Sequence, residues 1–140
     1  MTEADFRAIE DFLGRPLPPQ YREVMRQNPL DPADSNSRLA LCNDVRSVLG
    51  HNAELREGEF AAEWHADRFV IGSSPCGDSY FLDVTGASPA VWVWDHETHA
   101  VSEEAPDLDR FIADWKRIEV EATQRKQRGV SERPWWQFWK

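Results

Sequence analysis

Residues 69–98 read FVIGSSPCGDSYFLDVTGASPAVWVWDHET. Three short runs rich in β-branched and aromatic residues are separated by clusters of Gly, Pro, Ser and Asp, which favour turns. This pattern predicts strands over residues 68–72, 79–84 and 90–95. Because the connections are short, we expect the strands to be antiparallel neighbours in a meander of hairpins. The third strand is apolar on both faces, which predicts a central strand covered on both sides.

Two helices are predicted ahead of this sheet. The first covers residues 2–13 and opens with the spacing of a capping box, and the second follows a Pro-Pro pair. Between these helices and the sheet we expect a surface loop over residues 31–37, a short strand over residues 39–42 and a short helix over residues 43–49. The residues that follow, 51–66, fit a helix only in part, because a glycine interrupts them.

A closing helix is predicted from near Asp107. Its apolar residues recur at helical spacing as far as Ile118, and the pattern fades after Ala122. The order of helices, meandering strands and a closing helix packed on the sheet indicates an α+β fold. We therefore predict one domain over residues 1–122, followed by a basic linker and a Trp-rich tail over residues 123–140.

Charge is distributed unevenly along the 140 residues. Residues 1–115 carry nine Lys and Arg against 22 Asp and Glu, a formal charge of −13, whereas residues 116–140 carry seven against three, a formal charge of +4. An acidic body repels nucleic acid phosphates and attracts a basic protein. Acidity also keeps a protein soluble, so the charge alone does not choose between a partner surface and a solvated one.

The first residues and the cysteines bear on the compartment. No run of about 18 apolar residues occurs, and the start of the chain lacks the basic and apolar segments of a signal peptide. We therefore expect a cytoplasmic protein with no transmembrane segment. Cys42 and Cys76 lie far apart and each lacks a second cysteine nearby, which favours two free thiols over a metal or redox site.

Three segments carry a family resemblance. They are IEDFLGRPLPPQYREVM at residues 9–25, FVIGSSPCGDSYFLDVT at residues 69–85 and VWVWDHET at residues 91–98. In their order and spacing the chain resembles the SUKH superfamily, the Smi/Knr-like proteins, over roughly residues 5–118. One departure is the first turn, which has Ser-Ser-Pro-Cys before Gly77 where many members are richer in glycine.

The resemblance implies an immunity protein of bacteria that neutralises a cognate toxin, of nuclease or deaminase type, by direct binding and not by chemistry. Fungal members of the family act as regulatory and scaffolding proteins. The alternative is therefore a regulatory or scaffolding module of cell-envelope or cell-wall processes. In that alternative the Trp-rich tail would be the docking segment.

Residues 95–99, Asp-His-Glu-Thr-His, resemble a metal motif only superficially. The zincin pattern places two histidines four residues apart on a helix, whereas these are three apart after a predicted strand, and no third ligand is identified. Asp78 and Asp83 could form an acid–base pair, but they are more easily explained as a turn former and a strand-end residue. Nucleophile-elbow, P-loop and dinucleotide motifs are absent from the sequence. We therefore expect no enzyme activity, no metal and no cofactor.

Acidic residues around the hairpins are the expected contacts with a basic toxin. Those of the run at residues 103–109 are expected before and within the start of the closing helix, where they could equally complement the helix dipole. Aromatic residues crowd the tail, where they could dock on a partner protein, on the protein itself or on a membrane surface. The expected partner contacts are Asp78, Asp95, Glu97, Glu103 and Glu104, and the expected docking residues of the tail are Trp135, Trp136, Phe138 and Trp139.

Overall fold

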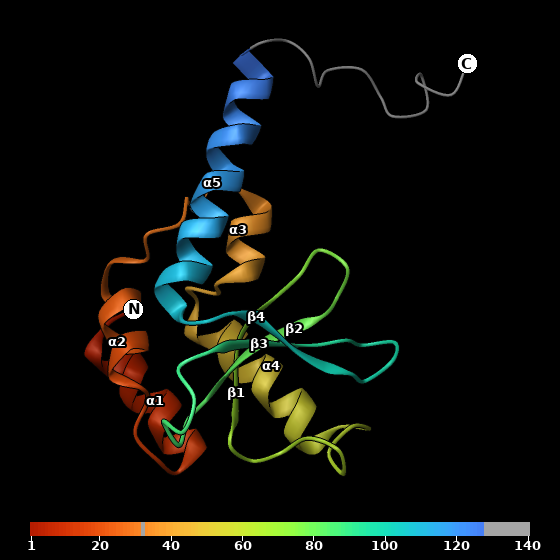
Figure 1. Ribbon diagram of the computed structural model, residues 1–140. Helices are drawn as coiled ribbons and strands as arrows, with labels where there is room; N and C mark the ends of the chain where they lie inside the picture. The colour runs from red at the N-terminus through yellow and green to blue at the C-terminus, as the bar shows by residue number, and fades with distance from the viewer. Residues whose placement is uncertain (32, 128–140) are drawn as a thin grey trace.

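The computed structural model describes residues 1–31 and 33–127 (Figure 1). Helices come first in the chain, a run of strands follows, and one long helix closes it, which confirms the predicted α+β fold. None of the helices in this described part is both long and apolar enough to cross a membrane. In chain order the elements are α1 (Glu3–Leu13), α2 (Pro19–Gln27), α3 (Ser35–Ala40), α4 (Val45–Glu57), β1 (Arg68–Ser73), β2 (Ser79–Asp83), β3 (Val91–Trp94), β4 (Val101–Ala105) and α5 (Leu108–Gln127).

The strands form one antiparallel sheet in the order β1-β2-β3-β4, so each strand pairs with its neighbour in sequence. The three strands and the antiparallel pairing predicted for residues 68–95 are confirmed. β3 lies between β2 and β4 as expected for a central strand. It is fully covered at Val91 and Trp94, whereas Trp92 and Val93 between them are only half-buried.

Side chains from the two faces of the sheet enter two hydrophobic clusters. The larger cluster joins one face to the helices, and in it Tyr80 of β2 packs edge-to-face on Phe111 of α5 with ring centroids 5.0 Å apart. The smaller cluster covers the other face, where Phe81 and Trp94 surround Trp64. The alternation of strand side chains therefore gives the sheet two buried faces of unequal extent.

The start of α1 is the predicted capping box. Asp5 N donates to Thr2 Oγ1 at 3.2 Å, and Thr2 N donates to Asp5 Oδ2 at 2.9 Å. Gly14 ends the helix with φ of 73°, a backbone conformation that glycine adopts without strain. Figure 1 shows α1 and α2 on one side of the molecule, with the β3–β4 hairpin pointing the other way.

Two predictions before the sheet are wrong. Residues 39–42 do not form a strand, because Ser35–Ala40 is a short helix, α3, which also takes the last residues of the predicted loop. Asp34 caps α3 by accepting hydrogen bonds from the N–H groups of Asn36 and Ser37. A helix of six residues is too short to show a 3.6-residue periodicity, so its apolar end resembled a strand.

Two further boundaries and one additional strand differ from the sequence prediction. The short helix expected over residues 43–49 is α4, which continues to Glu57 through the first part of the ambiguous segment. β4 was not predicted: four of its five residues are exposed, so VSEEA lacks the apolar alternation of a strand. Glu103 and Glu104 lie in this strand, ahead of the closing helix as expected. The closing helix runs to Gln127, beyond the predicted end at Ala122, and residues 123–127 are exposed.

Candidate functional site

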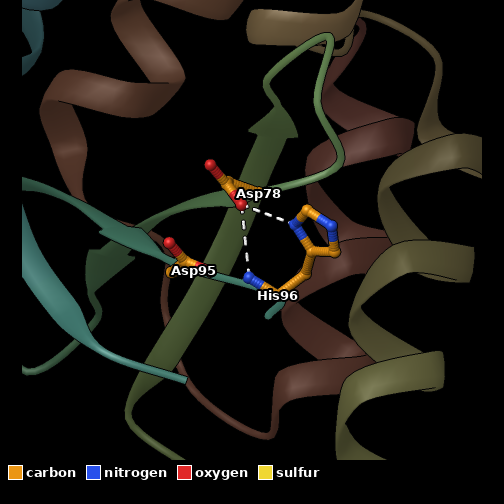
Figure 2. A group of neighbouring side chains, drawn as sticks. All are labelled: Asp78, Asp95 and His96. Carbon is orange, nitrogen blue, oxygen red and sulfur yellow. Dashed lines mark hydrogen bonds and ion pairs between the residues drawn. The ribbon is translucent and has the colours of Figure 1, made fainter. Parts of the chain in front are cut away.

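Strand register brings the two acidic turns of the sheet together. The β1–β2 turn leads into Ser79, which pairs with Trp94 at the end of β3, so Asp78 and the residues after Trp94 lie side by side. Figure 2 shows Asp78, Asp95 and His96 grouped at this end of the sheet. The sequence marked all three residues, but their proximity depends on a register that sequence alone does not give.

Asp78 fixes the position of His96. Its Oδ1 accepts a hydrogen bond from His96 N at 3.2 Å and lies 2.7 Å from His96 Nδ1 (Figure 2). The hydrogen bond to Asp78 raises the pKa of His96, and the negative charges of Asp78, Glu97 and Asp95 act in the same direction. Asp78 therefore joins the β1–β2 turn to the β3–β4 turn.

Asp95 builds the β3–β4 turn itself. Its Oδ1 accepts hydrogen bonds from Glu97 N at 2.8 Å and Thr98 N at 3.0 Å, and these bonds lower the pKa of its carboxyl group. The ring of His99 stacks on Trp94 with centroids 5.0 Å apart, and its Nδ1 lies 2.8 Å from a carboxylate oxygen of Glu63. This anchoring of the turn by His99 was not anticipated from the sequence, since Glu63 is distant along the chain.

Asp78, Asp95 and His96 are also the group of side chains that could hold a metal ion. Ligand atoms of Asp78, Asp95 and His96 all lie within 4.8 Å of one another. However, Asp95 Oδ1 already accepts two backbone hydrogen bonds, and Asp78 Oδ1 accepts one from His96 N and is in contact with His96 Nδ1. Two carboxylates and an imidazole are suitable ligands for a cation. The hydrogen bonds of the two turns are nevertheless sufficient to explain why these side chains lie together.

The acid–base pair considered for Asp78 and Asp83 is not assembled. Asp78 precedes β2 and Asp83 ends it, so the two carboxyl groups lie at opposite ends of one strand. Asp83 Oδ1 instead accepts hydrogen bonds from Thr85 N at 2.9 Å and Thr85 Oγ1 at 2.6 Å. Both residues thus have the turn and strand-end roles that the sequence favoured.

Three other predicted contact residues face solvent. The side chain of Glu97 at the tip of the turn is 79% exposed, and Glu103 and Glu104 are exposed along β4. Partial burial raises the pKa of Glu104, and the Asp114 carboxylate of α5 acts in the same direction. The register of β4 shifts next to Glu104, between the pairs formed by Glu103 and Ala105, which makes Glu104 the extra residue of a bulge.

The outer edge of β1 is closed by groups of the same chain. The buried Asn52 of α4 donates to Val70 O at 3.0 Å and accepts from Val70 N at 2.8 Å. Cys42 N donates to Ile71 O at 2.9 Å, and Arg56 donates to Arg68 O at 2.9 Å. The polar backbone groups of this edge are therefore satisfied internally.

The outer edge of β4 is open. Within residues 1–31 and 33–127, no hydrogen bond joins residues 101–105 to any segment other than β3. Residues 101–104 are all exposed, and Figure 1 shows the start of β4 projecting with its hairpin away from the helices. An edge strand of this kind presents unpaired N–H and C=O groups to its surroundings.

These features define a class: a small α+β domain whose meander carries an acidic, open edge strand next to a rigid Asp-His-Glu turn. The sequence matches the model of the SMI1 / KNR4 family (SUKH-1) over residues 1–114. The chain therefore belongs to this family, and the resemblance carried by its three segments is confirmed. Neither the curated proteins nor the solved structures gave a match. Family membership supports a non-enzymatic immunity or regulatory role in general, exercised through protein–protein interaction.

Proposed function

We propose that this protein neutralises a basic cognate toxin, of nuclease or deaminase type, by binding it directly in the cytoplasm. The single observation that carries the proposal is the set of exposed carboxylates along the β3–β4 hairpin of a SUKH-1 domain, with Glu97 at its turn and Glu103 and Glu104 further along β4. A basic active-site cleft of an enzyme that acts on nucleic acid is the complement of such a surface.

The overall charge favours the same partner. Residues 1–115 carry a formal charge of −13, so a basic protein is attracted over a distance comparable with the Debye length, about 8 Å at physiological ionic strength. Attraction of this kind raises the association rate and the specificity more than it raises the affinity. Binding should therefore weaken and slow as salt is added.

Asp78 and Asp95 contribute to this surface indirectly. Because Asp78 holds His96 and Asp95 holds the N–H groups of Glu97 and Thr98, the turn presents Glu97 in one conformation. A rigid turn loses less conformational entropy when a partner binds it. In the proposal these two carboxylates are positioning residues, while Glu97 and the two β4 carboxylates contact the toxin.

Co-expression with the toxin-like product of a neighbouring gene tests this function. The wild-type protein should restore growth and should co-purify with the toxin. Glu103→Lys combined with Glu104→Lys should reduce both, whereas Asp11→Lys combined with Glu23→Lys, which reverses two exposed charges on α1 and α2, should reduce neither. A wild-type protein that neither protects nor captures any toxin domain would contradict the proposal.

A second candidate is a regulatory or scaffolding module of cell-envelope or cell-wall processes. It is favoured by the aromatic residues crowded into the end of the sequence, which lie outside the described residues: Trp135, Trp136, Phe138 and Trp139. Deleting residues 130–140 and measuring binding to anionic vesicles separates the two candidates. Vesicle binding that depends on these residues supports the second candidate, and its absence with and without them removes the envelope version.

A further inference from the structure

Within the described part of the chain, the N–H and C=O of Val101 on the open edge of β4 are free to pair with another strand. Asp95 N donates to Ala100 O at 2.9 Å and Asp95 O accepts from His99 N at 2.8 Å, so Asp95 takes the hydrogen-bonded position opposite a bulge formed by His99 and Ala100. In antiparallel strands hydrogen-bonded and non-hydrogen-bonded pairs alternate. The next pair, Trp94 with Val101, is therefore of the second kind, so the N–H and C=O of Val101 face away from β3.

Carboxylates flank this backbone pair. Glu103 and Glu104 are exposed on the same short strand, and Asp114 of α5 lies close enough to influence the pKa of Glu104. Exposed carboxylates on an edge strand discourage acidic strands from pairing with it, and the bulge at Glu104 ends the regular ladder after Glu103. A strand that brings lysine or arginine side chains instead gains ion pairs along the same edge.

A groove adjoins the edge on the sheet face opposite α5. It has a volume of about 300 Å³, and Phe81, Trp92 and Val101 form its apolar part. Its other lining residues are polar or charged: His65, Asp67, Arg68, Asp83 and Ser88. Val101 is 40% exposed and Trp92 is half-buried, so apolar surface remains available there. Because side chains of an added strand alternate between faces, every second side chain would lie on the groove side.

We propose that β4 is a docking strand: an extended segment of a partner protein, with basic residues alternating with small apolar or β-branched ones, pairs with residues 101–103 as a fifth strand of the sheet. Main-chain hydrogen bonds supply affinity in this mode, and the side-chain environment supplies specificity. The inference rests on the proposed function only in taking the toxin as the source of the segment.

A second copy of this chain is a poorer occupant. Pairing two β4 strands would bring Glu103 and Glu104 of one copy close to the same carboxylates of the other. Like charges facing each other across strands destabilise the pair. The acidic edge therefore selects a basic segment over self-association.

Amide exchange measured by NMR on the full chain tests the docking strand. The probe is the blocked peptide Lys-Val-Lys-Thr-Lys-Val-Lys-Thr-Lys. Its control replaces both valines by proline, which keeps the charge but removes backbone donors and extended pairing. With the valine peptide at ten times its measured Kd, exchange of the Val101 amide should slow about tenfold, because only the free fraction exchanges.

The control peptide should leave the Val101 amide unprotected, and the Glu103→Lys/Glu104→Lys variant should bind the valine peptide at least tenfold more weakly. The Asp11→Lys/Glu23→Lys variant should bind it as the wild type does. Equal binding of both peptides without protection of Val101, no binding of either at millimolar concentration, or a dimer with Val101 protected in the absence of peptide would each overturn the proposal. If the toxin is captured and neutralised while Val101 stays unprotected in the complex, the docking strand is wrong and the proposed function stands.

Discussion

The two edge strands of the sheet differ in how their outward backbone N–H and C=O groups are treated. β1 is covered by Asn52, by Cys42 and by Arg56, so its outward backbone groups have partners within the chain. β4 has no such cover among the described residues and instead carries exposed carboxylates and a bulge. The closed edge contributes to stability through buried hydrogen bonds, whereas the open edge leaves the same groups free for another molecule.

The largest effect is expected from opening the closed edge with Asn52→Leu. The substitution leaves the N–H and C=O of Val70 buried and unpaired, and it removes a second bond to the C=O of Val48, which keeps its helical partner in α4. Unpaired groups of this kind cost about 1–3 kcal/mol each, so the free energy of unfolding should fall by about 3 kcal/mol or more in urea denaturation.

The exposed Asn43, which makes no side-chain hydrogen bond within the described part of the chain, provides the control. Asn43→Leu should change the free energy of unfolding by less than about 0.5 kcal/mol. Equal effects of the two substitutions would mean that Asn52 does not close the β1 edge.

A smaller loss is expected from Gly72→Ala in β1. A Cβ atom at this position would lie 2.1 Å from Ala40 O, so α3 and β1 would have to separate. Overpacking of this kind costs about 1–3 kcal/mol. Gly50→Ala in α4 has nothing within 4 Å of the added atom and should stabilise the protein by up to about 1 kcal/mol. Thermal melts of the two variants should therefore shift in opposite directions, and a shift in the same direction would contradict the tight α3–β1 contact.

Reversing the charge of the open edge tests its function and not its stability. Glu103→Lys with Glu104→Lys should weaken binding of a basic partner about tenfold, roughly 1.4 kcal/mol, while the melting temperature stays close to that of the wild type. The effect should shrink at high salt because both carboxylates are exposed. Isothermal titration at two salt concentrations measures this, and an undiminished affinity would remove β4 from the binding surface.

The smallest effect concerns the turn that leads into the open edge. Because Asp78 raises the pKa of His96, the contribution of this contact to stability is complete below the unfolded-state pKa of about 6.5 and is lost as the pH rises through the higher folded-state pKa. Asp78→Asn should lower the pKa of His96 in an NMR titration and should remove this pH dependence. An unchanged titration of His96 in the variant would contradict the role of Asp78.

The sequence predicts the strand at the closed edge, β1, but not the strand at the open edge, β4. The predictions for β1, β2, β3 and the capping box of α1 succeeded because each has a local pattern of apolar alternation or spaced side-chain donors and acceptors. β4 was missed because an exposed acidic strand has no apolar face to alternate. The role of Asn52 was missed because its burial depends on the packing of α4 against β1, which a single asparagine in the sequence does not indicate.

In the candidate site, too, the sequence identifies single residues but not the contacts between distant ones. The sequence pointed to Asp78, Asp95 and Glu97 because acidic turn residues stand out between strands. That Asp78 holds His96 follows only from the register of β2 and β3. The partner contacts predicted from the sequence, Asp78, Asp95, Glu97, Glu103 and Glu104, stay a prediction, and in the proposal the first two act by positioning the turn. The domain boundary at residue 122 and the role of the residues beyond Gln127 also stay predictions.

The most direct test compares the backbone amides of Val70 and Val101, two residues of the same type on the two edges. In the free protein Val70 N donates to Asn52 Oδ1, while Val101 has its N–H on the open side, so Val70 should exchange slowly and Val101 rapidly. In a saturated complex with the captured toxin, Val101 should become protected and Val70 should not change. A Val101 amide that exchanges as rapidly in the complex as in the free protein would contradict docking at β4, and equal rates for the two valines in the free protein would contradict the difference between the edges.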